Sequence, residues 1–126
     1  MIKILKEIDG VITEIKKNKE VDAIYLFGSY ATGRTKPTSD IDICVIAKKD
    51  IQKEKKEEIL SNSSKKIDLV MFWDLPPVIR WRVLKEGKLL YEKNPLTLHR
   101  IKIEALKSYL DFQPIMRKHY LKVLGA

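Results

Sequence analysis

The sequence contains a single cysteine, Cys44, so a disulfide within the chain is excluded. With only two histidines besides, no Cys/His cluster has the spacing of a zinc site. Such a chain fits a reducing compartment, and we expect a cytoplasmic protein. Long apolar runs are also missing, because charges interrupt the N-terminal residues from Lys3 onward. We therefore expect neither a signal peptide nor a stretch of about 20 apolar residues that spans a membrane.

The chain has fewer acidic than basic residues. The chain has 17 Asp and Glu against 25 Lys and Arg, which gives a net charge of +8. This charge favours polyanionic partners such as nucleoside triphosphates, nucleic acids or acidic protein surfaces, without choosing among them. The length of 126 residues predicts one domain, residues 1–126, that buries roughly two-thirds of the surface of the unfolded chain.

Apolar periodicity predicts that helices and strands alternate along the chain. Strands are predicted at residues 21–27, 40–47 and 66–73, with a short edge strand at 88–92. Helices are predicted at 3–18 and 49–62, from Pro76 and Pro77 to Gly87, and from Pro95 onward, with a break or kink at Pro114. This alternation predicts α/β or α+β layers.

Three aspartates stand at the starts of two predicted strands. Asp40 and Asp42 are two residues apart on one strand, so both side chains project from the same face. Two carboxylates held together beside apolar residues are costly unless a cation lies between them, and hard oxygen ligands suit Mg²⁺. Asp68 occupies the same place in the next strand, so neighbouring strands would bring three carboxylates to one edge. Three acids can bridge two metal ions, as in phosphoryl-transfer sites.

The segment GSYATGRTKPTSDID, residues 28–42, joins the first two strands and has features of a phosphate site. Gly28 lets the backbone approach a phosphate, Ser29 offers a hydroxyl, and SYAT can begin a helix whose N–H groups face an anion. Arg34 and Lys36 add positive charge. A Gly-Ser pair alone is ordinary turn chemistry, and Asp68 alone reads as a strand-end cap or surface acid. The ordered combination of all these residues favours a joint phosphate and metal site.

The pattern Gly28-Ser29, ten residues, Asp40-x-Asp42 resembles the signature of nucleotidyltransferases of the DNA polymerase β superfamily. The short chain resembles the minimal nucleotidyltransferase branch of that superfamily. With Asp68 and the order of elements, the resemblance covers roughly residues 3–91. It implies a polymerase β-like fold, a small mixed sheet flanked by helices. A catalytic core, residues 1–92, would be followed by C-terminal helices in residues 94–126.

The resemblance also implies a role for each matching residue. Gly28 and Ser29 would hold the triphosphate of ATP. Asp40 and Asp42 would ligate two Mg²⁺ ions, and Asp68 would complete one of these sites and help to deprotonate the attacking hydroxyl. The reaction would be in-line attack on the α-phosphorus, with transfer of the nucleoside monophosphate and release of pyrophosphate.

Members of this minimal branch are often encoded beside a HEPN-domain ribonuclease toxin and act as its antitoxin. They transfer AMP to a tyrosine of the toxin and can also bind it, so the resemblance implies a protein adenylyltransferase in a hetero-oligomer. Apolar residues cover a broad arc of the helix after Pro95, which makes residues 94–126 a candidate partner interface. The alternative is a helix packed fully on its own sheet. His99 and His119 are expected at the surface or an interface rather than in catalysis.

Two rival functions stay open. The acceptor could be an RNA 3′ end or a small-molecule hydroxyl, although 126 residues leave no room for the domains that hold a primer, and a net charge of +8 disfavours polycations. A non-catalytic antitoxin would instead block its partner by contact and keep the acids as remnants. The completeness of the motif favours the enzyme. Neither the preferred nucleotide nor direct nucleic-acid binding can be predicted from these residues.

Overall fold

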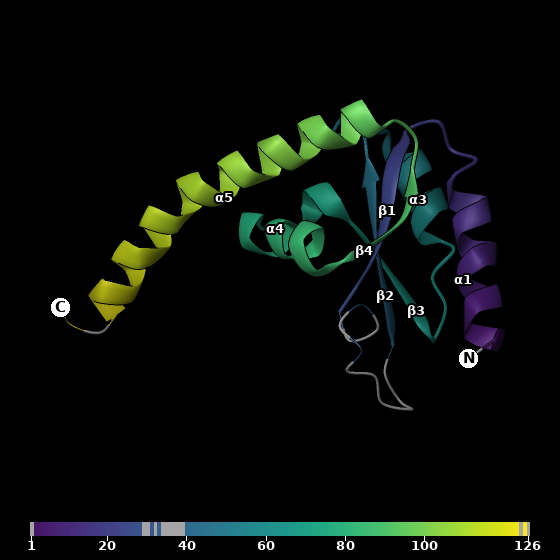
Figure 1. Cartoon of the computed structure of the whole chain (residues 1–126), viewed down its shortest axis with the longest axis horizontal. Helices are drawn as coiled ribbons and strands as arrows, with labels where there is room; N and C mark the ends of the chain where they lie inside the picture. The colour runs from purple at the N-terminus through teal and green to yellow at the C-terminus, as the bar shows by residue number, and fades with distance from the viewer. Residues whose placement is uncertain (1, 29–30, 32, 34–39, 124, 126) are drawn as a thin grey trace.

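Residues 2–28, 31, 33, 40–123 and 125 are described by the computed structural model (Figure 1). The elements are α1 (Ile2–Ile15), β1 (Val21–Phe27), β2 (Ile41–Ala47), α3 (Lys53–Leu60), β3 (Ile67–Met71), the 3₁₀ turn η1 (Phe72–Asp74), α4 (Pro77–Glu86), β4 (Lys88–Glu92) and α5 (Pro95–Val123). The predicted alternation of helices and strands is confirmed. Within the described ranges, no helix has the length and apolar character needed to cross a bilayer.

The strands form one mixed sheet in the order β3-β2-β1-β4, with β4 at an edge as predicted. β1 is antiparallel to both β2 and β4, whereas β2 and β3 are parallel. Parallel strands cannot be joined by a tight hairpin, and α3 supplies the crossover between them. As a result, β2 and β3 begin at the same end of the sheet, and β1 ends there.

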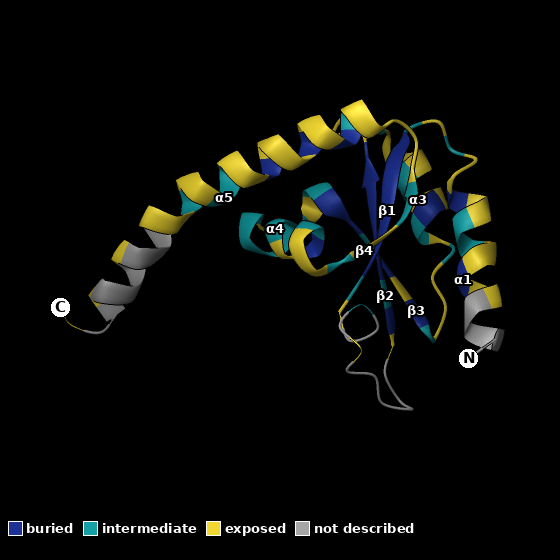
Figure 2. Ribbon diagram, viewed as in Figure 1, coloured by how far each residue is buried: buried dark blue, intermediate teal, exposed yellow. Residues whose placement is uncertain are grey.

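Helices cover both faces of the sheet (Figure 1). Ile15 of α1 and Ile59 of α3 belong to the core on one face, and Val83 of α4 and Ile101 of α5 belong to the core on the other. Side chains alternate along a strand, so β1 and β2 supply residues to both cores. Figure 2 shows these two central strands buried along most of their length. Burial on both faces explains why their sequences are apolar at successive positions.

The C-terminal segment is one continuous helix, α5, with Pro114 inside it. Of the predicted break or kink at Pro114, the break is therefore wrong. Proline lacks the N–H that would bond to the carbonyl of Leu110, one turn earlier. Both residues are exposed, so water can hydrogen-bond to the freed carbonyl and the helix continues. In Figure 1 the later part of α5 projects past α4 and the sheet.

Cys44 lies in the central strand β2 and has no exposed surface. Burial raises the pKa of its thiol, so the reactive thiolate is absent at neutral and mildly alkaline pH. We expect dithionitrobenzoate to leave the native protein unlabelled and to release one equivalent of dye per chain in guanidinium chloride. Rapid labelling of the native protein would contradict the position of Cys44 in the sheet.

Candidate active site at one end of the sheet

Two aspartates meet on neighbouring strands. Asp42, the second residue of β2, is paired in register with Asp68, the second residue of β3. The amide N–H of Ile41 donates to the carbonyl of Lys66 at 2.7 Å and secures this register. Asp40 stands directly before β2. The structure therefore pairs Asp42 with Asp68 and places Asp40 at the same end of the sheet, where β1 ends and where β2 and β3 begin.

The paired carboxylates project from the face of the sheet that α4 and α5 cover. Side chains two residues apart on a strand point to the same face, so Asp42 shares its face with Cys44, and Asp68 shares its face with Val70. Cys44 and Val70 both pack in the core on the side of α4 and α5. Asp42 is partly buried, whereas Asp40 and Asp68 are exposed. The site is thus open to solvent on one side and bounded by packed side chains on the other.

Asp42 is the electrostatically unfavourable member of the group. Burial raises the pKa of its carboxyl above the ordinary value of 3.8, and the charges of Asp68 and Asp40 raise it further. Since like charges disfavour the ionised form, a cation in this position would stabilise it. Among the described residues, no three His, Cys, Asp or Glu side chains converge closely enough to hold a metal ion by themselves. Mg²⁺ tolerates such a site, because it usually takes one or two carboxylates together with waters and substrate phosphates.

Gly28 lies against the carboxylate of Asp42. Its φ is +75°, in the left-handed region, and a Cβ at this position would collide with Oδ2 of Asp42. The amide N–H of Ala31 donates to the carbonyl of Gly28 at 3.2 Å, so a turn begins directly after β1. Glycine is therefore required here both for the backbone conformation and for the space that the carboxylate occupies.

The remaining predicted phosphate-binding residues, Ser29, Arg34 and Lys36, lie outside the described residues. Their roles stay predictions. The structure places Gly28, at the start of the segment, against Asp42, at its end.

A cavity of about 230 Å³ adjoins Gly28. Its walls are Phe27 and Gly28 at the end of β1 and Ile79, Arg82, Val83 and Glu86 of α4. Pockets for drug-sized ligands measure about 300–1,000 Å³, so this cavity suits one ring system rather than a whole nucleotide. Arg82 and Glu86 are exposed and one helical turn apart, and they add a donor and an acceptor to an otherwise apolar lining. Neither residue could be predicted from the sequence, because no motif marks them.

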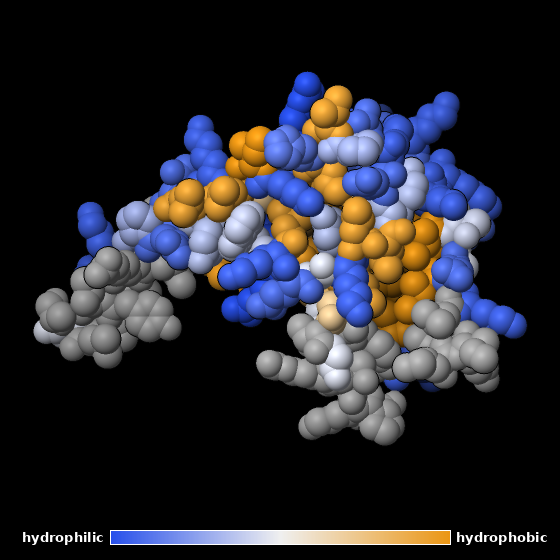
Figure 3. Space-filling model, in the orientation of Figure 1, coloured by the Kyte–Doolittle hydropathy of each residue, from blue (hydrophilic) through white to orange (hydrophobic). Residues whose placement is uncertain are grey.

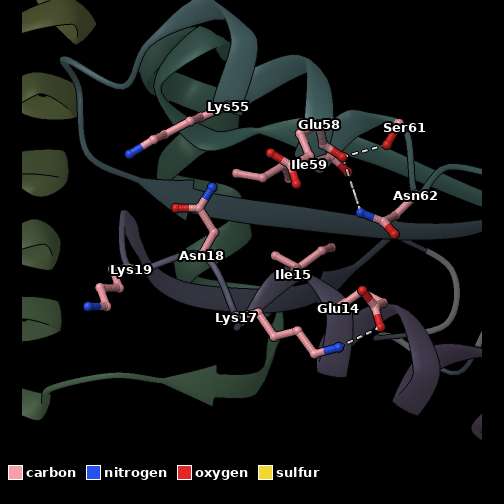
Figure 4. Close-up of a pocket in the computed structure, with 10 residues that line it drawn as sticks. All are labelled: Glu14, Ile15, Lys17, Asn18, Lys19, Lys55, Glu58, Ile59, Ser61 and Asn62. Carbon is pink, nitrogen blue, oxygen red and sulfur yellow. Dashed lines mark hydrogen bonds and ion pairs between the residues drawn. The ribbon is translucent and has the colours of Figure 1, made fainter.

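A larger cavity, of about 500 Å³, lies on the opposite face of the sheet between the end of α1 and α3 (Figure 4). Several of its polar groups are already bonded within the protein. Lys17 pairs with Glu14 at 2.9 Å, and Ser61 and Asn62 donate to the carbonyl of Glu58. This cavity contains none of the three aspartates, so its size does not make it the candidate active site.

Sequence comparison gives matches to a family and to archaeal proteins. Residues 10–96 match the family described as "Polymerase beta, Nucleotidyltransferase". Two proteins of Methanocaldococcus jannaschii, each provisionally named a protein adenylyltransferase, are similar to this chain. One is 33% identical over 57% of this chain and 57% of its own length. The other is 32% identical over 68% of this chain and 84% of its own length. The chain thus spans just over half of the length of the first relative.

Solved structures share the fold. A toxin–antitoxin structure with AMP-PNP matches with a TM-score of 0.73 and 23% identity, over 96% of this chain and 98% of that chain. A structure of a tri-AMPylated Shewanella oneidensis HEPN toxin in complex with MNT antitoxin matches with a TM-score of 0.68 and 23% identity, over 97% of this chain and 98% of that chain. A protein of Sulfolobus solfataricus, provisionally assigned as a nucleotidyltransferase, matches with a TM-score of 0.55 and 25% identity, over 73% of this chain and 83% of that chain.

Proposed function

The chain belongs to the polymerase beta nucleotidyltransferase family, and on this basis we propose that it is a Mg²⁺-dependent protein adenylyltransferase. It transfers AMP from ATP to a tyrosine of a HEPN-domain toxin and acts as the antitoxin. The observation that carries the proposal is the in-register pairing of Asp42 with Asp68, with Gly28 packed against the Asp42 carboxylate. A protein that inhibits by contact alone has no need of this arrangement.

The carboxylates fit Mg²⁺ in chemistry and in charge. Asp40 and Asp42 would hold two ions, and Asp68 would complete one of the two sites. When bound, the ions would supply positive charge opposite the triphosphate. The raised pKa of Asp42 supports this assignment, because burial and the charges of Asp68 and Asp40 disfavour its ionised form, and a bound cation would offset both effects.

The residues of the chain position the substrates and move one proton. Gly28 allows the backbone to approach the triphosphate, and Ser29 would add its hydroxyl. Asp68, exposed at the start of β3, accepts the proton of the attacking tyrosine hydroxyl. The hydroxyl oxygen then bonds to the α-phosphorus while the bond to the leaving oxygen breaks, so AMP stays on the tyrosine and pyrophosphate departs. The apolar cavity beside Gly28 offers space for a ring of one substrate next to the reacting groups.

Solved relatives support the choice of substrates and partner. One contains AMP-PNP, an ATP analogue, and another contains an AMPylated HEPN toxin bound to its antitoxin. We assign ATP as the donor, a HEPN toxin as the acceptor and the cytoplasm as the place of reaction. Residues 1–92 form the catalytic core in this proposal, and residues 94–126 contact the partner. An RNA or a small-molecule acceptor has no comparable support.

The proposal is tested with the HEPN toxin encoded nearest to this gene. Incubation with the purified protein, ATP and Mg²⁺ is expected to raise the intact mass of the toxin by whole AMP units, and chelation of the metal by EDTA should stop the reaction. Peptide mapping should place AMP on tyrosine. A toxin that is inhibited but keeps its mass would support the contact mechanism instead, and extension of an RNA primer would identify a nucleic-acid acceptor.

A further inference from the structure

Helix α5 has two apolar faces, and the fold covers only one. Leu98, Ile101 and Ala105 are at most 8% exposed and belong to the core under the helix. The other face carries four exposed apolar side chains, Leu96 (70%), Ile103 (55%), Leu106 (37%) and Leu110 (53%), and the exposed His99 lies among them. Figure 3 shows apolar side chains along this helix. We call these four residues the α5 stripe.

The α5 stripe has the spacing of a helix-packing seam. Leu96, Ile103 and Leu110 are seven residues apart, and Leu106 lies three residues after Ile103 and four before Leu110. At about 3.6 residues per turn, these side chains align along one side of the helix, nearly opposite the buried side. Apolar residues that alternate in steps of three and four are typical of helices that pack against another helix. A helix is therefore the expected occupant of the stripe.

Basic residues border the α5 stripe. Arg100 and Lys107 lie along one side and Lys102 along the other, and all three are exposed. The acids of this part of the helix, Glu104 and Asp111, lie farther from the stripe, and Glu104 is paired with Lys49. Charges next to an apolar seam select the partner helix, so a helix with Asp or Glu beside its own apolar residues is complementary.

The same charges disfavour a second copy of this chain. In an antiparallel pair, Arg100 and Lys107 would face the same residues of the other copy. In a parallel pair, Lys107 would face Lys102. Both arrangements bring like charges together, which selects against self-association.

We propose that the α5 stripe binds an amphipathic helix of the protein substrate, one whose apolar face is bordered by acidic residues. The identity of that substrate rests on the proposed function, whereas the stripe and its charges do not. The stripe lies on the side of α5 opposite the residues that pack on the sheet, whereas Asp42 and Asp68 belong to the sheet itself. Docking and AMP transfer thus use separate surfaces, and docking raises the effective concentration of the acceptor tyrosine at the site.

The test combines a stripe variant with a matched control. In the double variant Ile103→Asp, Leu110→Asp, toxin binding is expected to weaken on the order of a hundredfold or more, because two apolar contacts are lost and like charge is added. The unfolding midpoint should change little, since both residues are exposed. Leu89→Asp makes the same chemical change at a residue that is 43% exposed on β4, outside the stripe, and should leave toxin binding unchanged.

Binding is measured by calorimetry without ATP, so the result stands whether or not AMP transfer occurs. Wild-type affinity should fall as salt rises, and Arg100→Glu with Lys107→Glu should weaken binding and reduce this salt dependence. Unchanged affinity in the double stripe variant would overturn the proposal. Light scattering that shows a wild-type dimer and a monomeric stripe variant would overturn it in favour of a second copy.

Discussion

Asp42→Asn is expected to lower AMP transfer by roughly a thousandfold or more, because bound metal ions contribute several kcal/mol of transition-state stabilisation. In the absence of metal, the same change should make the protein more stable. Asp42 is partly buried on β2 and lies near the charges of Asp68 and Asp40, and asparagine removes the charge of Asp42 with little change in the size of the side chain. Loss of activity with a gain in stability is the signature of a residue kept for function.

The stability gain should depend on pH in a defined direction. The pKa of Asp42 is raised in the folded protein, so the folded state binds its proton more tightly than the unfolded state does. The stability of the wild type therefore falls relative to that of the variant as pH rises from 3.8, the ordinary pKa of the carboxyl, through its raised pKa in the folded protein. Above the raised pKa, the difference in stability between the two proteins stays constant. Below 3.8 the difference should vanish, because Asp42 is then protonated in both states.

Thermal unfolding with EDTA or with Mg²⁺ measures both effects. The metal should raise the unfolding midpoint of the wild type and raise that of Asp42→Asn much less. Asp50→Asn is the matched control, since it removes the same charge at an exposed position beyond the other end of β2. It should leave activity and the response to Mg²⁺ unchanged. If Asp42→Asn kept its activity, or if it were less stable than the wild type in EDTA at neutral pH, the assignment of Asp42 would be wrong.

The meeting of Asp42 and Asp68 could be predicted because it depends on strand patterns alone. Two apolar strands with an aspartate at the same point near each start, joined by a helix, become parallel neighbours, and parallel neighbours place equivalent residues side by side. The position of Arg82 and Glu86 could not be predicted in this way. It depends on how α4 packs against the end of β1, and helical periodicity carries no information about that packing.

The apolar residues of α5 show a second limit of the sequence pattern. Ile101 and Ile103 are both strongly apolar and only two residues apart, yet the first is 8% exposed and the second is 55% exposed. Apolar character on both sides of a helix cannot reveal which side faces the sheet. Pro114 is a related case, because the helix tolerates a missing hydrogen bond where water can replace it.

Gly28→Ala is expected to reduce AMP transfer about a hundredfold, because its Cβ would occupy the place of the Asp42 carboxylate. The flexible end of Asp42 can move away, so the cost falls on the geometry of the site rather than on the fold. Alanine at a φ of +75° also strains the backbone, by about 1 kcal/mol, which corresponds to a fall in unfolding temperature of about 4 °C.

Gly33→Ala separates these two effects. Gly33 has nearly the same φ, +74°, but a Cβ there would meet no atom of the other described residues within 4 Å. This control should lose a similar amount of stability and keep most of its activity, so the ratio of AMP-transfer rates between the two variants isolates the displacement of Asp42. Toxin modification followed by intact mass over time gives that ratio. Equal activity of the two variants would mean that the close approach of Gly28 to Asp42 has no part in the reaction.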